Sequence, residues 1–89
     1  MVSVKKIDER TFEVTVQGRT TTKHEVTVEP SYYETLTSGN FTPEKLMVKS
    51  FEFLHEMEPN TSILRKFDLS VIRQFFPEYE REIQKIMGK

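Results

Sequence analysis

Apolar and polar residues alternate with a period of two through most of the first thirty positions, and this alternation limits the possible folds most strongly. In residues 12–17, Phe12, Val14 and Val16 share one face, and the intervening residues are polar. Successive side chains of a strand point to opposite faces, so this period predicts a half-buried β-strand. The chain is therefore expected to begin with a sheet.

Two further segments show the same alternation on either side of residues 12–17. Their expected inward residues are Val2, Val4 and, less strongly, Ile7 in the first, and Thr22, His24, Val26 and Val28 in the second. The connections are short, and the second contains Gly18, a typical turn residue. Pro30 ends the third segment because proline supplies no N–H to a sheet. Three strands joined in this way most simply form an antiparallel meander with one apolar face.

Helical patterns follow the third strand. A short helical turn is expected over residues 31–36. Thr42, Pro43 and Glu44 are typical of a helix start, because they supply a cap, a proline in the first turn and an acid near the positive end of the dipole. The apolar stripe that follows has helical spacing and ends before Pro59; it consists of Leu46, Met47, Ser50, Phe53, Leu54 and Met57.

Short helices are also expected between residue 60 and the C-terminus. A residue among 60–62 caps the first, Asp68 caps the second, and Pro77 begins the last. Their apolar residues, in order, are Ile63, Leu64 and Phe67; Val71, Ile72, Phe75 and Phe76; and Ile83, Ile86 and Met87. Strands followed by helices are typical of an α+β domain. We therefore predict a single α+β domain over residues 1–89: a three-stranded antiparallel β-meander followed by three or four short helices packed on one face.

The charge balance gives the chain little overall attraction for polyanions. The 89 residues include 13 Lys and Arg against 14 Asp and Glu, a formal net charge of −1, so no net positive field favours nucleic acid or anionic lipid. No hydrophobic run approaches the roughly 18 residues of a membrane span, and the N-terminus lacks the apolar core of a secretion signal. The chain has no cysteine, which fits a reducing compartment. We expect a cytoplasmic protein.

A local group of basic residues leaves a nucleic-acid-associated protein as the alternative. Within residues 62–76, Arg65, Lys66 and Arg73 oppose only Asp68, and phosphate binding uses several such contacts. The apolar residues between them have core-facing spacing, however. Burying one large apolar side chain is worth about 1.5–3 kcal/mol, against about 0–1 kcal/mol for an exposed ion pair. We therefore expect the burial of its apolar side chains to determine how this segment folds. Its charged side chains are then expected to lie in water.

The sequence shows no pattern typical of catalysis. It contains no cysteine, no G-x-S-x-G motif and no glycine-rich phosphate loop. A small metal- or ligand-binding protein using His24 and His55 is the third hypothesis, although their spacing matches no zinc motif. A structural role for His24 on its strand face and a solvated His55 are the favoured interpretations. We expect no catalytic activity, no bound metal and no cofactor.

Aromatic residues crowd the second half of the chain, and an exposed group of them would mark a partner interface. The residues expected to contact a partner are Phe51, Phe76 and Tyr79; the competing interpretation is that the aromatics simply fill the core. An open edge of the first or third strand offers a second route, since an edge accepts a partner strand. The leading hypothesis is a small non-enzymatic protein-interaction module with an unidentified protein partner.

Three segments also carry a resemblance. The stretches TTTKHEVTVEP, TPEKL with SFEFL, and EPNTSILRKFDLSVIRQFFPEYE resemble a group of short bacterial proteins without assigned function, and the resemblance covers most of the chain. It implies a small bacterial protein of the cytosol, and it brings no catalytic residue to carry over.

Overall fold

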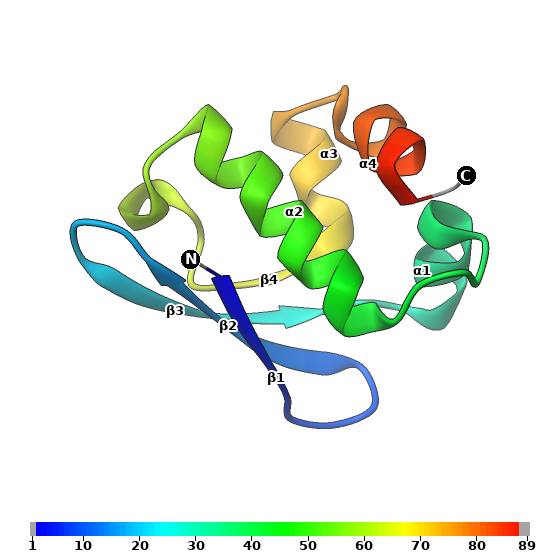
Figure 1. The fold of residues 1–89 in the computed structure, drawn as a ribbon, viewed down its shortest axis with the longest axis horizontal. Helices are drawn as coiled ribbons and strands as arrows, with labels where there is room; N and C mark the ends of the chain where they lie inside the picture. The colour runs from blue at the N-terminus through cyan, green and yellow to red at the C-terminus, as the bar shows by residue number, and fades with distance from the viewer. Residues whose placement is uncertain (1, 88–89) are drawn as a thin grey trace.

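The computed structural model describes residues 2–87, which form a four-stranded mixed sheet with its helices on one face (Figure 1). The strands are β1 (Val2–Lys6), β2 (Thr11–Gln17), β3 (Thr21–Thr27) and β4 (Lys66–Asp68), in the spatial order β1-β2-β3-β4. The helices are α1 (Pro30–Thr37), α2 (Pro43–Met57), α3 (Ile72–Phe75) and α4 (Tyr79–Met87), with 3-10 turns η1 (Asn60–Ser62) and η2 (Leu69–Val71). This arrangement confirms the predicted α+β class.

The first three strands pair as an antiparallel meander. Val4 is opposite Val14 across β1 and β2, and Val14 is opposite His24 across β2 and β3. The period of two therefore lays rows of inward side chains across the sheet, beneath α2. Phe12, Val14 and Val16 are fully buried there, as the alternation predicts.

The predicted helix over residues 60–67 is wrong, because this segment forms η1 and then β4, which runs parallel to β3. The buried side-chain amide of Asn60 donates to two backbone carbonyls of the β2–β3 hairpin, at 3.2 and 2.8 Å, and η1 lies beside that hairpin (Figure 1). The backbone N–H of Glu25 donates to the carbonyl of Arg65 at 2.7 Å. These bonds attach the segment to the sheet and satisfy backbone groups that a helix would otherwise pair internally.

Helix α2 begins and ends where the sequence predicts. The Thr42 hydroxyl accepts a hydrogen bond from the backbone N–H of Lys45 at 3.1 Å, and Pro43 occupies the first turn. The chain leaves the helix at Glu58, whose extended backbone (φ −158°, ψ 160°) is the conformation favoured before the proline at position 59. At 15 residues, α2 is long enough to cross the inner face of the sheet.

Among the described residues, five that the sequence analysis placed on apolar faces are exposed instead: Ile7, Met57, Leu64, Phe75 and Ile86. Ile7 is 52% exposed, because β1 ends one residue before it. Ile86 is 53% exposed, because α4 buries Tyr79, Ile83 and Met87, which repeat every four residues along one line of the helix.

One hydrophobic core fills the space between the sheet and the helices. Its buried members are Phe12, Val14, Val16, Val26, Val28, Leu36, Leu46, Met47, Phe51, Phe53, Leu54, Ile63, Leu69, Ile72, Tyr79, Ile83 and Met87. Polar atoms inside it are paired: every buried side-chain nitrogen or oxygen among the described residues has a hydrogen-bond partner. The core thus draws on strands and on helices from both ends of the sequence.

Candidate functional site

An apolar groove of about 310 Å³ opens between the C-terminal end of α2, the segment that leads into β4, and helix α3. Its lining residues are Leu54, Glu58, Ser62, Ile63, Leu64, Phe67, Val71, Ile72, Phe75 and Phe76. Ligand pockets range from about 300 to 1,000 Å³, so this groove lies at the small end. It has room for a few side chains of a larger partner.

The groove lining combines core residues with strongly exposed ones. Ile63 and Ile72 are only 5% and 3% exposed, whereas Leu64 is 48% and Phe75 is 65% exposed. Fully burying a large apolar side chain stabilises a fold by about 1.5–3 kcal/mol. Leu64 and Phe75 contribute less than this because each is about half exposed or more. Single exposed apolar residues are ordinary on protein surfaces, but two of them lining one groove are typical of a contact surface.

Short, capped turns position the rim of the groove. A carboxylate oxygen of Asp68 accepts a hydrogen bond from the backbone N–H two residues later, at 3.0 Å, and so caps η2; this confirms the predicted cap. Helix α3 has only four residues and ends at Phe76, because the residue before Pro77 is kept out of the helical conformation. This single helical turn carries Ile72 into the core and leaves Phe75 on the rim.

One end of the groove is electronegative. Glu58 is the charged residue of the lining, and it caps the C-terminus of α2. The helix dipole places partial negative charge at the same end, and Glu56 is exposed in the last turn. A cationic group next to Glu58 would therefore be favoured.

Two of the three aromatic residues expected to contact a partner are inside the core. Phe51 and Tyr79 have no exposed surface. The Phe51 ring packs against His24 and Phe67, with centroids 5.2 and 6.0 Å apart, because β4 supplies a neighbour that the sequence did not reveal. Only Phe76 lies at the surface, half-buried in the groove lining. Phe51 and Tyr79 are therefore not available at the surface, and the exposed aromatic residue of the groove lining is Phe75, next to Phe76; contact of any of these residues with a partner stays a prediction.

The three basic residues of the nucleic-acid alternative come from two parts of the fold. Arg65 precedes β4, Lys66 begins β4, and Arg73 lies in α3. The Lys66 ammonium is 3.5 Å from a carboxylate oxygen of Glu25, and the Arg73 guanidinium is 3.2 Å from one of Glu80. These carboxylates offset the positive charge of two of the three cations. A nucleic-acid contact by these residues stays a prediction.

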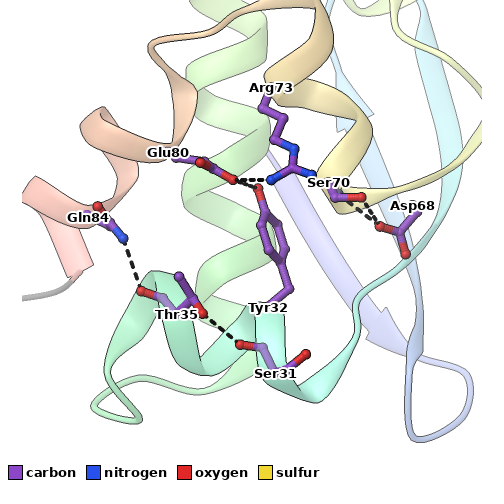
Figure 2. Close-up of polar contacts among 8 residues, drawn as sticks. All are labelled: Ser31, Tyr32, Thr35, Asp68, Ser70, Arg73, Glu80 and Gln84. Atoms are coloured by element: carbon purple, nitrogen blue, oxygen red, sulfur yellow. Dashed lines mark hydrogen bonds and ion pairs between the residues drawn. The ribbon is translucent and has the colours of Figure 1, made fainter.

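Arg73 belongs to a polar cluster that joins α1, α3 and α4 (Figure 2). The Tyr32 hydroxyl donates to Glu80 at 2.8 Å, Arg73 donates to the same oxygen at 3.2 Å, and the guanidinium lies 6.0 Å from the centre of the Tyr32 ring. Burial raises the pKa of the Tyr32 phenol, and the bond to Glu80 raises it further. The phenol therefore remains a hydrogen-bond donor, and the cluster connects the helices.

The two histidines occupy different environments. His24 is fully buried on the inner face of β3, with Nδ1 2.6 Å from the carbonyl oxygen of Leu64 and Nε2 2.8 Å from the Thr22 hydroxyl. His55 is exposed in the last turn of α2. Within residues 2–87, no group of three or more His, Cys, Asp or Glu side chains is arranged to hold a metal ion.

The two strand edges considered from the sequence differ in how far they are covered. The strand order places β1 at an edge, whereas β4 covers β3. The open strand carries Lys5 and Lys6, and lysines on an edge discourage pairing with another chain. β4 pairs with Glu25–Thr27 of β3, so it covers the C-terminal part of that edge, and the lysines make the first strand a poor docking edge.

The sequence analysis did not identify Leu64 and Phe75 as surface residues, although the sequence held a signal for Leu64. Each belongs to an adjacent apolar pair, Ile63–Leu64 and Phe75–Phe76. Neighbouring side chains point to opposite faces in an extended segment, so only one member of such a pair readily reaches the core there. For residues 63 and 64, the buried member is Ile63.

Comparison with protein-family models, curated proteins and solved structures gives no match for this chain. None of the described helices combines the length and the apolar character needed to cross a membrane. The groove is therefore the feature of the molecule from which a function can be inferred.

Proposed function

We propose that the protein is a non-enzymatic interaction module that binds the apolar face of a partner protein's helix in the groove beside α3. The observation that carries this proposal is the groove itself, with Leu64 and Phe75 exposed in its lining. The lack of catalytic motifs in the sequence supports a binding role, and the resemblance to short bacterial proteins supports a setting in the bacterial cytoplasm.

The polarity of the lining favours a helix over an extended peptide. Glu58 and Ser62 are the polar side chains of the lining, so the groove offers few groups to pair with peptide N–H and C=O groups. An extended segment entering it would leave backbone groups unsatisfied, whereas a helix pairs its own. Helices dock in such grooves through apolar side chains spaced three and four residues apart.

The electronegative end of the groove adds a charge requirement. Glu58 and the C-terminus of α2 face the same region, and a lysine or arginine beside them would gain a complementary partner. We therefore commit to an amphipathic helix with a large apolar face and a basic residue at one end of that face. A second copy of this chain and a small apolar molecule are the competing occupants.

Peptide affinities test the proposal. The probe is a short helical peptide with leucines three and four residues apart and flanking lysines; a second peptide replaces the lysines with glutamates. We expect the lysine peptide to bind more tightly, because its charge complements Glu58, as measured by fluorescence anisotropy. Leu64→Glu and Phe75→Glu should each weaken binding by about tenfold or more, since about 1.4 kcal/mol corresponds to tenfold.

Ile86→Glu is the matched control, because Ile86 is 53% exposed and lies outside the groove lining. This variant should bind the lysine peptide as the parent protein does. Equal loss in all three variants, or no binding of either peptide, would contradict the proposal. Sedimentation equilibrium adds a further check: self-association abolished by Phe75→Glu but not by Ile86→Glu would assign the groove to a second copy instead.

A further inference from the structure

Helix α3 is too short to keep its position by itself, although it carries the most exposed apolar side chain of the groove lining. It has four residues, and a single turn makes too few internal hydrogen bonds to be stable without tertiary contacts. Ile72 is buried, and Phe76, the residue after the helix, packs against Phe53 with ring centroids 6.0 Å apart. Phe75, by contrast, is 65% exposed. Burial therefore holds the inner side of α3 and contributes little at Phe75.

Arg73 supplies a further attachment of α3. Its guanidinium donates to a carboxylate oxygen of Glu80 in α4 at 3.2 Å and lies 6.0 Å from the centre of the Tyr32 ring in α1 (Figure 2). Successive residues of an α-helix are turned by about 100°, so residues 73 and 75 point to nearly opposite sides. Arg73 therefore holds α3 toward α1 and α4, while Phe75 projects from the other side into the groove lining.

The groups that receive Arg73 are joined to each other independently of α3. The Glu80 oxygen that accepts from Arg73 also accepts the Tyr32 hydroxyl, at 2.8 Å. The side-chain amide of Gln84 in α4 donates to the backbone carbonyl of Thr35 in α1 at 3.1 Å (Figure 2). These two bonds connect α1 to α4, so Arg73 attaches α3 to a pair of helices that stays together when α3 moves.

We propose that Arg73, held by Glu80 and Tyr32, is a positioning residue for the groove: it fixes α3 so that Phe75 stands where a partner contacts it. We call these three residues the α3 clamp. None of them belongs to the groove lining, so the clamp acts on a partner only through α3. This inference rests on the proposed function for its effect on binding.

The strength of the clamp suits a local role. The side chains of Arg73 and Glu80 are 54% and 36% exposed, and ion pairs of such exposure contribute little to global stability. The core does not depend on them. Loss of the clamp should therefore loosen α3 while the rest of the protein stays folded.

The first measurement requires no ligand. Its reporter is the backbone amide of Phe76, whose hydrogen bond to the Ile72 carbonyl, at 2.8 Å, closes the single turn of α3. In Arg73→Gln, the hydrogen-exchange protection of this amide should fall by about threefold or more, the size expected when a partly exposed ion pair is lost. Amides in the central strand β2 should change less, because α3 opens locally.

Arg10→Gln is the matched control. It makes the same substitution and removes the same charge, in an ion pair with Glu29 at 3.0 Å whose side chains are 59% and 56% exposed, and it lies outside the groove lining. Phe76 protection should stay at the parent value in this variant.

A charge exchange tests the pair itself. Arg73→Glu places two carboxylates together and should lower Phe76 protection further than Arg73→Gln does, because like charges repel. Combining Arg73→Glu with Glu80→Arg restores two opposite charges at the same positions. The double variant should recover most of the lost protection.

Peptide affinity measures the consequence for the groove. Arg73→Gln should weaken binding of the lysine-flanked leucine peptide by about threefold or more, and Arg10→Gln should bind it as the parent protein does. Removing a cation by itself favours a basic peptide, so the expected loss runs against the charge effect. Measured well below the unfolding temperature, the affinity of the folded protein does not respond to a loss of global stability alone.

The inference is overturned if Phe76 protection is unchanged in Arg73→Gln, if Arg10→Gln lowers it equally, or if the charge exchange recovers nothing. Equal peptide affinity of the parent and Arg73→Gln would overturn it as well, since α3 would then be held without positioning the groove, and the proposed function would stand. A peptide that binds neither protein would instead overturn the proposed function, and the positioning role would fall with it.

Discussion

At the scale of single residues, a buried pair of hydroxyl groups connects α2 to α4. The hydroxyl oxygens of Ser50 and Tyr79 are 2.6 Å apart, and both residues are fully buried. Burial raises the pKa of the Tyr79 phenol, so it remains protonated. Each hydroxyl satisfies the other, and the small side chain at position 50 leaves room for the tyrosine ring to pack beneath α2.

Removing both of these hydroxyls should cost less than the sum of the costs of removing each one alone. Tyr79→Phe or Ser50→Ala leaves a buried hydroxyl without its partner, at a cost of about 1–3 kcal/mol in the free energy of unfolding. The double variant leaves none, so its loss should be smaller than the sum of the single losses. Urea unfolding of all four proteins measures this coupling. Strictly additive losses would show that the pair does not interact.

At the level of elements, the predictable parts are those with a long periodic pattern. The seven residues of β2 and the 15 of α2 each repeat their period several times, so their faces are defined locally. The three-residue β4 contains too few residues for any period. Its pairing with β3 joins residues about forty positions apart, and the buried Asn60 that supports it resembles an ordinary helix cap in sequence.

The cap of α2 provides a test at this scale. Thr42→Ala removes the oxygen that accepts from the Lys45 N–H, and loss of such a cap typically costs about 1 kcal/mol. Thr61→Ala is the control, since Thr61 is exposed in η1 and should change stability by no more than about 0.5 kcal/mol. Thermal and urea unfolding of both variants give the comparison. Equal effects would mean that the Thr42 bond does not stabilise α2.

At the level of the whole molecule, the sheet has one face under helices and one without them (Figure 1). The order of strands and helices predicts this layering, because each amphipathic element has one side to bury. The groove was less predictable. The sequence marks residues 62–76 as a mixed apolar and basic segment, yet which aromatic residues stay exposed depends on the one-turn helix α3 and on the contact of the β4 residue Phe67 with Phe51.

The central claim is that a partner helix binds in the groove between α2, β4 and α3. The most direct measurement is a map of backbone amide shifts during titration with the lysine-flanked leucine peptide. If a helix binds there, the shifted residues should cluster at 54–58, 62–67 and 71–76. Shifts centred instead on the open edge of β1 or on the outward-facing Thr15 and Lys23 of the sheet, or no shifts at all, would contradict it.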